Sequence, residues 1–351
     1  MQIDFHHATT YVLARLAGFD PSQAEIVAYS AQYVDDAVNS GPIEFANGAM
    51  YARISSAHKM LDYRNFVTLA DHLVWVPFHF LPGNGGLPRG QDPQGSFIRK
   101  LVCTPNSHVA QDMIRSVIET CDRRHALHRL GIAMHTYADT WAHQGFAGVR
   151  HEINHAIDLT DHEGHPHLSL VERLKNYFIE LILPLGHGTV LGNPDRPYLV
   201  WGYTNGLGER IERNNPRDFL DACEQMTKAM QRFIAADPDY PAPGLRPEDR
   251  DTLRLMITEI RLEEADERHE VWLEEIANGA FSFGPEQIEY VGEGEGSWKH
   301  HALGVLDPPD DGFVYAPEFL KSDWKLFHDA LQAHRLDLVS NILPEYGICV
   351  A

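Results

Sequence analysis

The chain has 351 residues, enough for one large hydrophobic core or two ordinary domains. Its 44% hydrophobic composition is typical of a globular protein rather than a disordered one. The formal net charge of −21 makes extended nucleic acid or an anionic membrane surface a poor partner, because both repel an acidic protein at long range. A small phosphate-bearing substrate is compatible with this charge, since clustered metal ions reverse the local field.

Three further properties bear on the compartment. The four cysteines show no C-x-x-C spacing, which predicts reduced thiols in a cytosolic protein. The N-terminal segment lacks the basic and apolar regions of a signal peptide. No stretch approaches the ~18 apolar residues of a membrane span. We therefore expect a cytoplasmic protein without a membrane span, and the sequence predicts no particular oligomeric state.

The predicted elements are helical throughout. Apolar residues at helical spacing predict helices over residues 4–17, 20–37, 106–118, 125–144, 168–185, 216–236, 247–277 and 322–343. Gly18 is expected to end the first helix, and Asp20-Pro21 to begin the second. Residues 278–318, rich in Gly, Pro and acids, are expected to form a surface excursion. No alternating strand pattern of any length is visible, so we expect one all-α domain over residues 1–351.

The helix predicted over residues 125–144 carries the first candidate metal ligands. His135, Asp139 and His143 are four residues apart, so their side chains project from one helix face. Two imidazoles and a carboxylate in this arrangement can chelate a first-row divalent cation. The alternative is a polar face on which the aspartate pairs with the histidines, the more common outcome for so short a pattern. The apolar surroundings favour ligands, because unpaired charge would be costly there.

Other segments add candidates, each with a plainer alternative. His79 lies within an apolar run, where a hydrogen-bonded core histidine is the alternative. Asp35 and Asp36 end the second predicted helix and could simply be solvated acids. His6 and His7 lie on the first predicted helix, and we expect one of them to face inward.

Two histidine pairings are available for a further ligand set. His187 follows a predicted helix and Asp195 lies eight residues on, although helix capping and turn formation would also explain them. His151 and His155 are one helical turn apart and could also bind metal, but their surroundings are polar. We favour His187 with Asp195.

The order of these pieces resembles the zinc-dependent phospholipase C / P1 nuclease family. An early histidine, an aspartate ending the second helix, a histidine in an apolar segment and a helical His-x3-Asp follow one another over roughly residues 1–200. The resemblance implies an all-α fold with up to three zinc ions between helices. It also implies a ligand set of His6, Asp36, His79, His135 and Asp139, with Asp139 bridging two metals.

The chain departs from that family in three places. The family's processed N-terminal tryptophan binds one zinc, and Met1-Gln2 stands here instead, so that site is altered or absent. The family's next histidine lies six residues after the bridging aspartate, whereas His143 lies four after Asp139. A later His-x3-Glu pair is missing, and His187 with Asp195 is the substitute that we favour. Two metals are therefore better supported than three.

These observations predict a metal-dependent hydrolase that acts on a small phosphoester at a multinuclear zinc-like site, with Asp36 as the general base. A second hypothesis keeps the ligands but binds iron or manganese, giving a redox enzyme on a helical scaffold. A third is a catalytically inactive binding or assembly protein with the same fold.

Overall fold

Short capping motifs define the helices that carry the N-terminal part of the chain. The structure, a computed structural model, describes residues 1–57, 68–161, 190, 192–307 and 312–349. Gly18 ends α1 in the left-handed conformation (φ 116°), which glycine adopts without strain. Asp20 caps α2 through a capping box with Gln23, with Pro21 at the first turn. Both predicted boundaries are confirmed.

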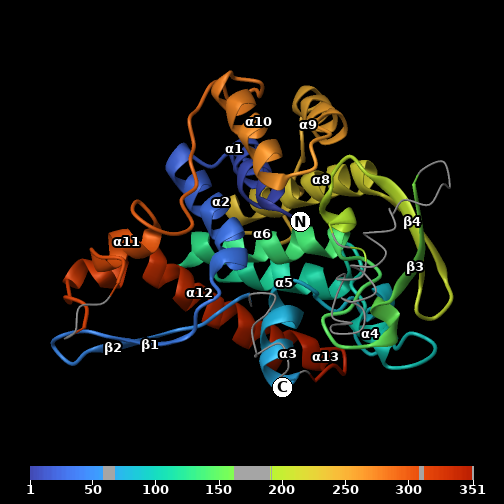
Figure 1. The fold of residues 1–351 in the computed structure, drawn as a ribbon, viewed down its shortest axis with the longest axis horizontal. Helices are drawn as coiled ribbons and strands as arrows, with labels where there is room; N and C mark the ends of the chain where they lie inside the picture. The colour runs from blue at the N-terminus through green and yellow to red at the C-terminus, as the bar shows by residue number, and fades with distance from the viewer. Residues whose placement is uncertain (58–67, 162–189, 191, 308–311, 350–351) are drawn as a thin grey trace.

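The helical segments of four or more residues follow one another around a central helix, α6 (Figure 1). They are η1 (Asp4–Thr9), α1 (Thr10–Ala17), α2 (Pro21–Asp36), α3 (Thr68–Phe78), α4 (Ile98–Leu101), α5 (His108–Glu119), α6 (Ala126–Ala142), α8 (Asn215–Ile234), α9 (Pro247–Glu259), α10 (Ala265–Ala277), α11 (Trp298–Leu303), η7 (Pro317–Lys321), α12 (Asp323–Asp337) and η8 (Leu338–Ile342). Single turns lie at η3 (Asn84–Gly86), η4 (Glu152–Asn154), η6 (Asn193–Asp195) and α13 (Leu343–Glu345). The helix predicted over residues 168–185 lies outside the described residues.

The prediction of an all-α fold is wrong. About 53% of the chain is helical, and the described residues also form two small antiparallel sheets, so the fold is mixed. The first sheet is a hairpin of β1 (Gly41–Glu44) and β2 (Met50–Arg53). In the second, β4 (Val200–Asn205) pairs with both β3 (Ala156–Asp161) and β5 (Arg210–Asn214).

Both sheets carried sequence signals that compete with helical periodicity. The hairpin turns at Asn47-Gly48, where Gly48 takes a positive φ of 84°. An Asn-Gly pair is the strongest short-range sequence signal of a hairpin. In β4, Trp201 and Tyr203 are two residues apart and both are fully buried, as expected for one face of a strand. The strands are short, four to six residues, so this alternation covers only two or three positions.

A close crossing of α2 and α6 organises the centre of the molecule. A Cβ atom on Gly131 would lie 2.3 Å from the carbonyl oxygen of Val27 and 2.6 Å from Cβ of Ser30. Only glycine allows this approach to the middle of α2. From there the C-terminal end of α2 continues alongside α6, where Asp35 lies 3.8 Å from His135. Nearly every residue of α6 is buried. The crossing therefore places polar side chains of both helices in a region shielded from water.

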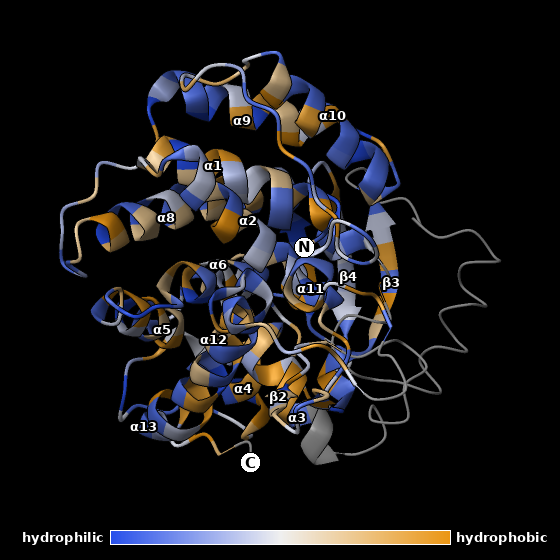
Figure 2. Cartoon of the chain, turned by 90° about the vertical axis from the view of Figure 1, so that its left-hand side faces the viewer, coloured by the Kyte–Doolittle hydropathy of each residue, from blue (hydrophilic) through white to orange (hydrophobic). Residues whose placement is uncertain are grey.

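The remaining helices enclose this pair. In Figures 1 and 2, α1 and α8 lie on one side of α6 and α5 and α12 on another, while α9 and α10 form an outer edge over α1 and α8. The chain begins in the interior, and Met1 is buried. No helix in the described part of the chain is long and apolar enough to cross a membrane.

Within the segment predicted as a surface excursion, residues 278–318, the stretch 290–298 packs against α2. Trp298 stacks on Tyr29 with ring centroids 3.9 Å apart, and the hydroxyl of Tyr290 donates to Asp36 at 2.5 Å. The long helix predicted over residues 247–277 is two helices, α9 and α10, because residues 260–264 interrupt it.

Candidate metal centre

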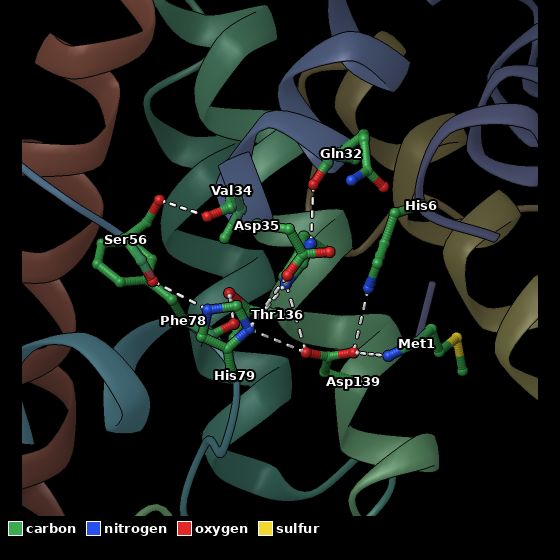
Figure 3. A network of polar contacts seen from close by, with 12 residues as sticks. Met1, His6, Gln32, Val34, Asp35, Ser56, Phe78, His79, Thr136 and Asp139 are labelled. Carbon is green, nitrogen blue, oxygen red and sulfur yellow. Dashed lines mark hydrogen bonds and ion pairs between the residues drawn. The ribbon is translucent and has the colours of Figure 1, made fainter. Parts of the chain in front are cut away.

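The carboxylate of Asp139 lies at the centre of a buried group of nitrogen and oxygen atoms. Asp139 and His135 lie one turn apart on α6, and their side chains are 1% and 0% exposed. The two oxygens of Asp139 face different neighbours, as Figure 3 shows. Oδ2 faces His79 and His135, whereas Oδ1 faces His6 and the α-amino group of Met1. The carboxylate thus joins two sets of donor atoms.

The first set contains four atoms at the spacing of metal ligands. Oδ2 of Asp139 lies 3.4 Å from Nε2 of His135 and 3.5 Å from Nδ1 of His79, and these two nitrogens are 3.1 Å apart. Oδ1 of Asp35, at the end of α2, lies 3.8 Å from each nitrogen. Two ligand atoms that are each ~2.1 Å from a tetrahedral zinc ion lie roughly 3.4 Å apart. The observed spacings, 3.1 to 3.8 Å, bracket that value.

Backbone carbonyls fix which ring nitrogens carry protons. Nε2 of His79 lies 2.9 Å from the carbonyl oxygen of Ser56, and Nδ1 of His135 lies 2.8 Å from that of Ala31. A carbonyl oxygen only accepts hydrogen bonds, so both nitrogens must donate. The neutral rings then present bare lone pairs at Nδ1 of His79 and Nε2 of His135. These two atoms lie 3.1 Å apart and face two carboxylates, an arrangement that a shared proton or a metal cation stabilises.

The electrostatics of Asp139 agree with a demand for positive charge. Burial opposes its ionisation, but His143, the Met1 amino group and His135 hold the pKa of Asp139 well below its usual range. Burial also acts to lower the pKa of His79, yet Asp139 and Asp35 outweigh it, so the pKa is raised. The first donor set therefore has the charge and the atoms to hold either a proton or a metal cation.

The second donor set lies around Oδ1 of Asp139. Nε2 of His6 lies 3.3 Å away, and both ring nitrogens of His6 form no hydrogen bond with any described residue. Burial and the neighbouring His135 lower the pKa of His6 to about 3, so its ring is neutral at pH 7 and can bind metal directly. The His6 ring stacks on His135 with centroids 3.7 Å apart.

Asp195 and His143 complete the second donor set, and the Met1 ammonium group lies beside both of its carboxylates. The amino nitrogen of Met1 lies 2.5 Å from Oδ1 of Asp139 and 3.3 Å from Oδ1 of Asp195. Nδ1 of His143 donates to the carbonyl oxygen of His79 at 2.7 Å, and its Nε2 lies 3.5 Å from Oδ1 of Asp195. Burial acts to lower the pKa of the Met1 amino group, but Asp139 and Asp195 outweigh it and raise the pKa to about 11.

Comparison with known proteins adds one finding. Residues 1–342 match a family of unknown function, DUF6765. The chain belongs to this family. Comparisons with curated proteins and with solved structures give no match. The resemblance to the phospholipase C / P1 nuclease family thus remains a resemblance in the order of ligands, and no relative links the chain to that family.

The structure separates the two aspartates at the end of α2 in this family member. Asp36, predicted as ligand and general base, turns away from the cluster and accepts hydrogen bonds from Tyr290 at 2.5 Å and Gln32 at 3.3 Å. Asp35 faces the cluster in its place, together with His79 and His135. The phase of α2 accounts for this difference, because consecutive residues of a helix point about 100° apart.

The other predicted ligands divide into three groups. The structure brings His6, His79, His135, Asp139, His143 and Asp195 together around the two donor sets. His187 lies outside the described residues. His151 instead caps η4, its Nδ1 accepting from the backbone N–H of Ile153 at 3.0 Å, and His155 follows that turn.

Proposed function

We propose that the chain is a metal-dependent hydrolase of a small phosphoester and uses two divalent cations that share Asp139. The observation that carries this proposal is the position of two imidazole nitrogens, from His79 and His135, in a buried region. They lie 3.1 Å apart and face carboxylate oxygens of Asp139 and Asp35 at 3.4 to 3.8 Å. Four lone-pair atoms at this spacing repel one another unless a cation lies among them.

The histidine and aspartate ligands favour a first-row divalent metal ion that is neither strongly hard nor strongly soft. Imidazole nitrogen suits zinc, iron and manganese, and carboxylate oxygen suits manganese and iron as well as zinc. No described residue contributes a thiolate to either donor group, since both are built from histidine and aspartate. We propose zinc for the first set, because the spacings among its atoms, 3.1 to 3.8 Å, bracket the ~3.4 Å between ligands of a tetrahedral zinc ion.

The exposure of the ligands indicates the side from which a substrate would approach. The side chain of Asp35 is 35% exposed, whereas those of Asp139 and His135 are almost fully buried. Bound divalent ions would lower the pKa of a water ligand and offset negative charge on a phosphoryl group. Asp35 has one oxygen directed at the imidazoles and reaches solvent, so it can accept a proton from that water. We therefore propose Asp35 as the general base.

The net charge of the chain limits the charge and the size of the substrate. A chain with a formal charge of −21 slows the approach of highly charged anions, so a monoanionic phosphodiester is favoured over a phosphomonoester dianion. The substrate would have to be small, because an extended nucleic acid adds many phosphates that the acidic surface repels.

Hydrolysis of bis(p-nitrophenyl) phosphate and p-nitrophenyl phosphate by zinc-loaded protein tests the proposal. We expect turnover of the diester that a chelator abolishes and zinc restores, and that is lost in Asp35→Asn. The matched control is Asp249→Asn, which alters a buried carboxylate that accepts only from Ser282 in the described structure.

Two outcomes would overturn the hydrolase proposal. Zinc-loaded protein that binds metal tightly but hydrolyses neither ester would favour a binding or assembly role. Protein that is purified with iron or manganese, and that gains an oxygen-dependent activity instead of hydrolysis, would favour the redox enzyme.

A further inference from the structure

A cavity of about 390 Å³ lies beside the end of α2, apart from the metal centre. It is lined by the residues that follow Asp35, by the end of β2, by α12 and by the glycine-rich segment 292–297. Its volume falls within the ~300–1,000 Å³ typical of small-molecule sites. The floor is formed by Arg53 together with Tyr33, Trp324 and His328, and the last three are at most 6% exposed.

The floor presents polar atoms that the described protein leaves without partners. Nε of Arg53 is buried and forms no hydrogen bond, and no described carboxylate pairs with this guanidinium. Nδ1 of His328 is likewise buried and unpaired. The hydroxyl oxygen of Tyr33 accepts from Nε1 of Trp324 at 3.2 Å, and no described group accepts its hydrogen. Two donors therefore converge on the cavity without an acceptor.

An unpaired guanidinium in this position calls for an anion. Arg53 is half-buried with its Nε shielded from water, and burial acts to lower the pKa of its guanidinium. Unpaired buried charge is costly, and a planar guanidinium binds a carboxylate through two parallel hydrogen bonds. The hydroxyl of Tyr33 adds a third donor to the same oxyanion.

The rim of the cavity carries the opposite charge. Glu293 and Asp307 are exposed acids on its lining, while Lys299 is engaged by the carbonyl oxygen of Leu306 at 3.2 Å. Asp36, the third acid, already accepts from two side chains. Three carboxylates against two cations disfavour a dianion such as phosphate. They favour a ligand that brings its own cation to the rim.

We infer that this cavity binds a small zwitterionic carboxylate of the free amino-acid type. Its carboxylate contacts Arg53 and Tyr33 on the floor, and its ammonium group faces Glu293 and Asp307 on the rim. The inference rests on groups outside the two donor sets, so it stands or falls independently of the hydrolase activity.

Binding measured by thermal shift and calorimetry tests the inference. The full-length, zinc-loaded chain is titrated with each common L-amino acid in turn. The tightest binder is then compared with its deaminated acid, with its decarboxylated amine and with inorganic phosphate. We expect at least one amino acid to bind, and each analogue and phosphate to bind at least about tenfold more weakly, since each lacks one charge-assisted contact.

Variants locate the site. Arg53→Gln is expected to weaken binding about tenfold or more, whereas Arg335→Gln, a half-buried arginine outside the cavity, leaves binding unchanged. Glu293 lies on the exposed rim, so Glu293→Lys cannot disturb the core. This variant should also weaken binding, and it tests the inference even if Arg53→Gln fails to fold. The inference is overturned if no amino acid binds, if phosphate or the deaminated acid binds as tightly, or if binding survives Glu293→Lys unchanged.

Discussion

Replacing Asp139 with asparagine removes the charge that joins the two donor sets while it keeps the size of the side chain. In the wild-type chain, zinc at about 1,000 times its dissociation constant stabilises the folded state by about 4.1 kcal/mol. A chain of 351 residues has an unfolding entropy of roughly 0.7 kcal/mol per kelvin, so this corresponds to a rise in Tm of about 6 °C.

The variant should lose most of that rise. Loss of a residue that hydrogen-bonds to a metal ligand typically weakens metal binding 10–100-fold. Loss of a ligand that bridges two metals should weaken metal binding by at least about 100-fold. At the same zinc concentration a 100-fold weaker site yields about 1.4 kcal/mol, or a rise in Tm of roughly 2 °C.

Differential scanning calorimetry of chelator-treated and zinc-loaded protein measures both shifts. Asp249→Asn, which removes an equally buried charge that bonds Ser282, should keep the wild-type rise. The reasoning is refuted if Asp139→Asn keeps a zinc-induced rise as large as that of the wild type.

The remaining predictions concern α2, its crossing with α6 and one buried histidine. Asp35→Asn should weaken zinc affinity by tenfold or more while Asp36→Asn changes it less than about twofold, as measured by competition with a chromogenic chelator; the reverse order would contradict the assignment of Asp35. Gly131→Ala should destabilise the fold by about 1–3 kcal/mol in urea unfolding, because its Cβ would clash with the carbonyl oxygen of Val27, and a more stable variant would refute that contact. Burial, aided by a neighbouring arginine, lowers the pKa of His328 to about 3, so its stabilising contribution is present above pH 6.5 and lost as pH falls toward 3. His328→Gln should therefore lose roughly 2 kcal/mol less unfolding free energy between pH 7 and pH 5 than the wild type, and equal losses would contradict the burial argument.

The ligands on α6 were predictable because a single helix fixes their relation. His135 and Asp139 are four residues apart, and any helix at that position places them on one face. Their partners come from other elements, so the sequence alone could offer them only as separate candidates. His79 was found because it is a polar residue within an apolar stretch, and His6 because it lies on the first predicted helix and matches the early histidine of the resembling family.

The choice between Asp35 and Asp36 depended on the phase of α2, and the sequence carried that information. Ala24, Ala28 and Ala31 are buried at positions i, i+4 and i+7 of one helix face, and the backbone of Ala31 contacts His135 on α6. The next position of that series, i+11, is Asp35. The order of ligands in the resembling family does not specify which of two adjacent aspartates points inward, so small-residue periodicity was the better guide.

The strands and the second donor set were harder to predict for different physical reasons. Helical periodicity over long segments outweighs an alternation that spans only Trp201 and Tyr203 in β4. The contact of the Met1 amino group with Asp139 joins groups 138 residues apart. No local pattern encodes such a contact, because tertiary packing alone brings the two together.

Anomalous X-ray scattering at the zinc edge, from crystals of zinc-loaded protein, tests the central claim most directly. We predict a peak within about 2.0–2.2 Å of Nδ1 of His79, Nε2 of His135 and Oδ2 of Asp139, with Asp35 as the fourth ligand. Ordered imidazoles in their present positions with no anomalous peak among them would show that a proton holds this group together, and would contradict the assignment of a metal centre.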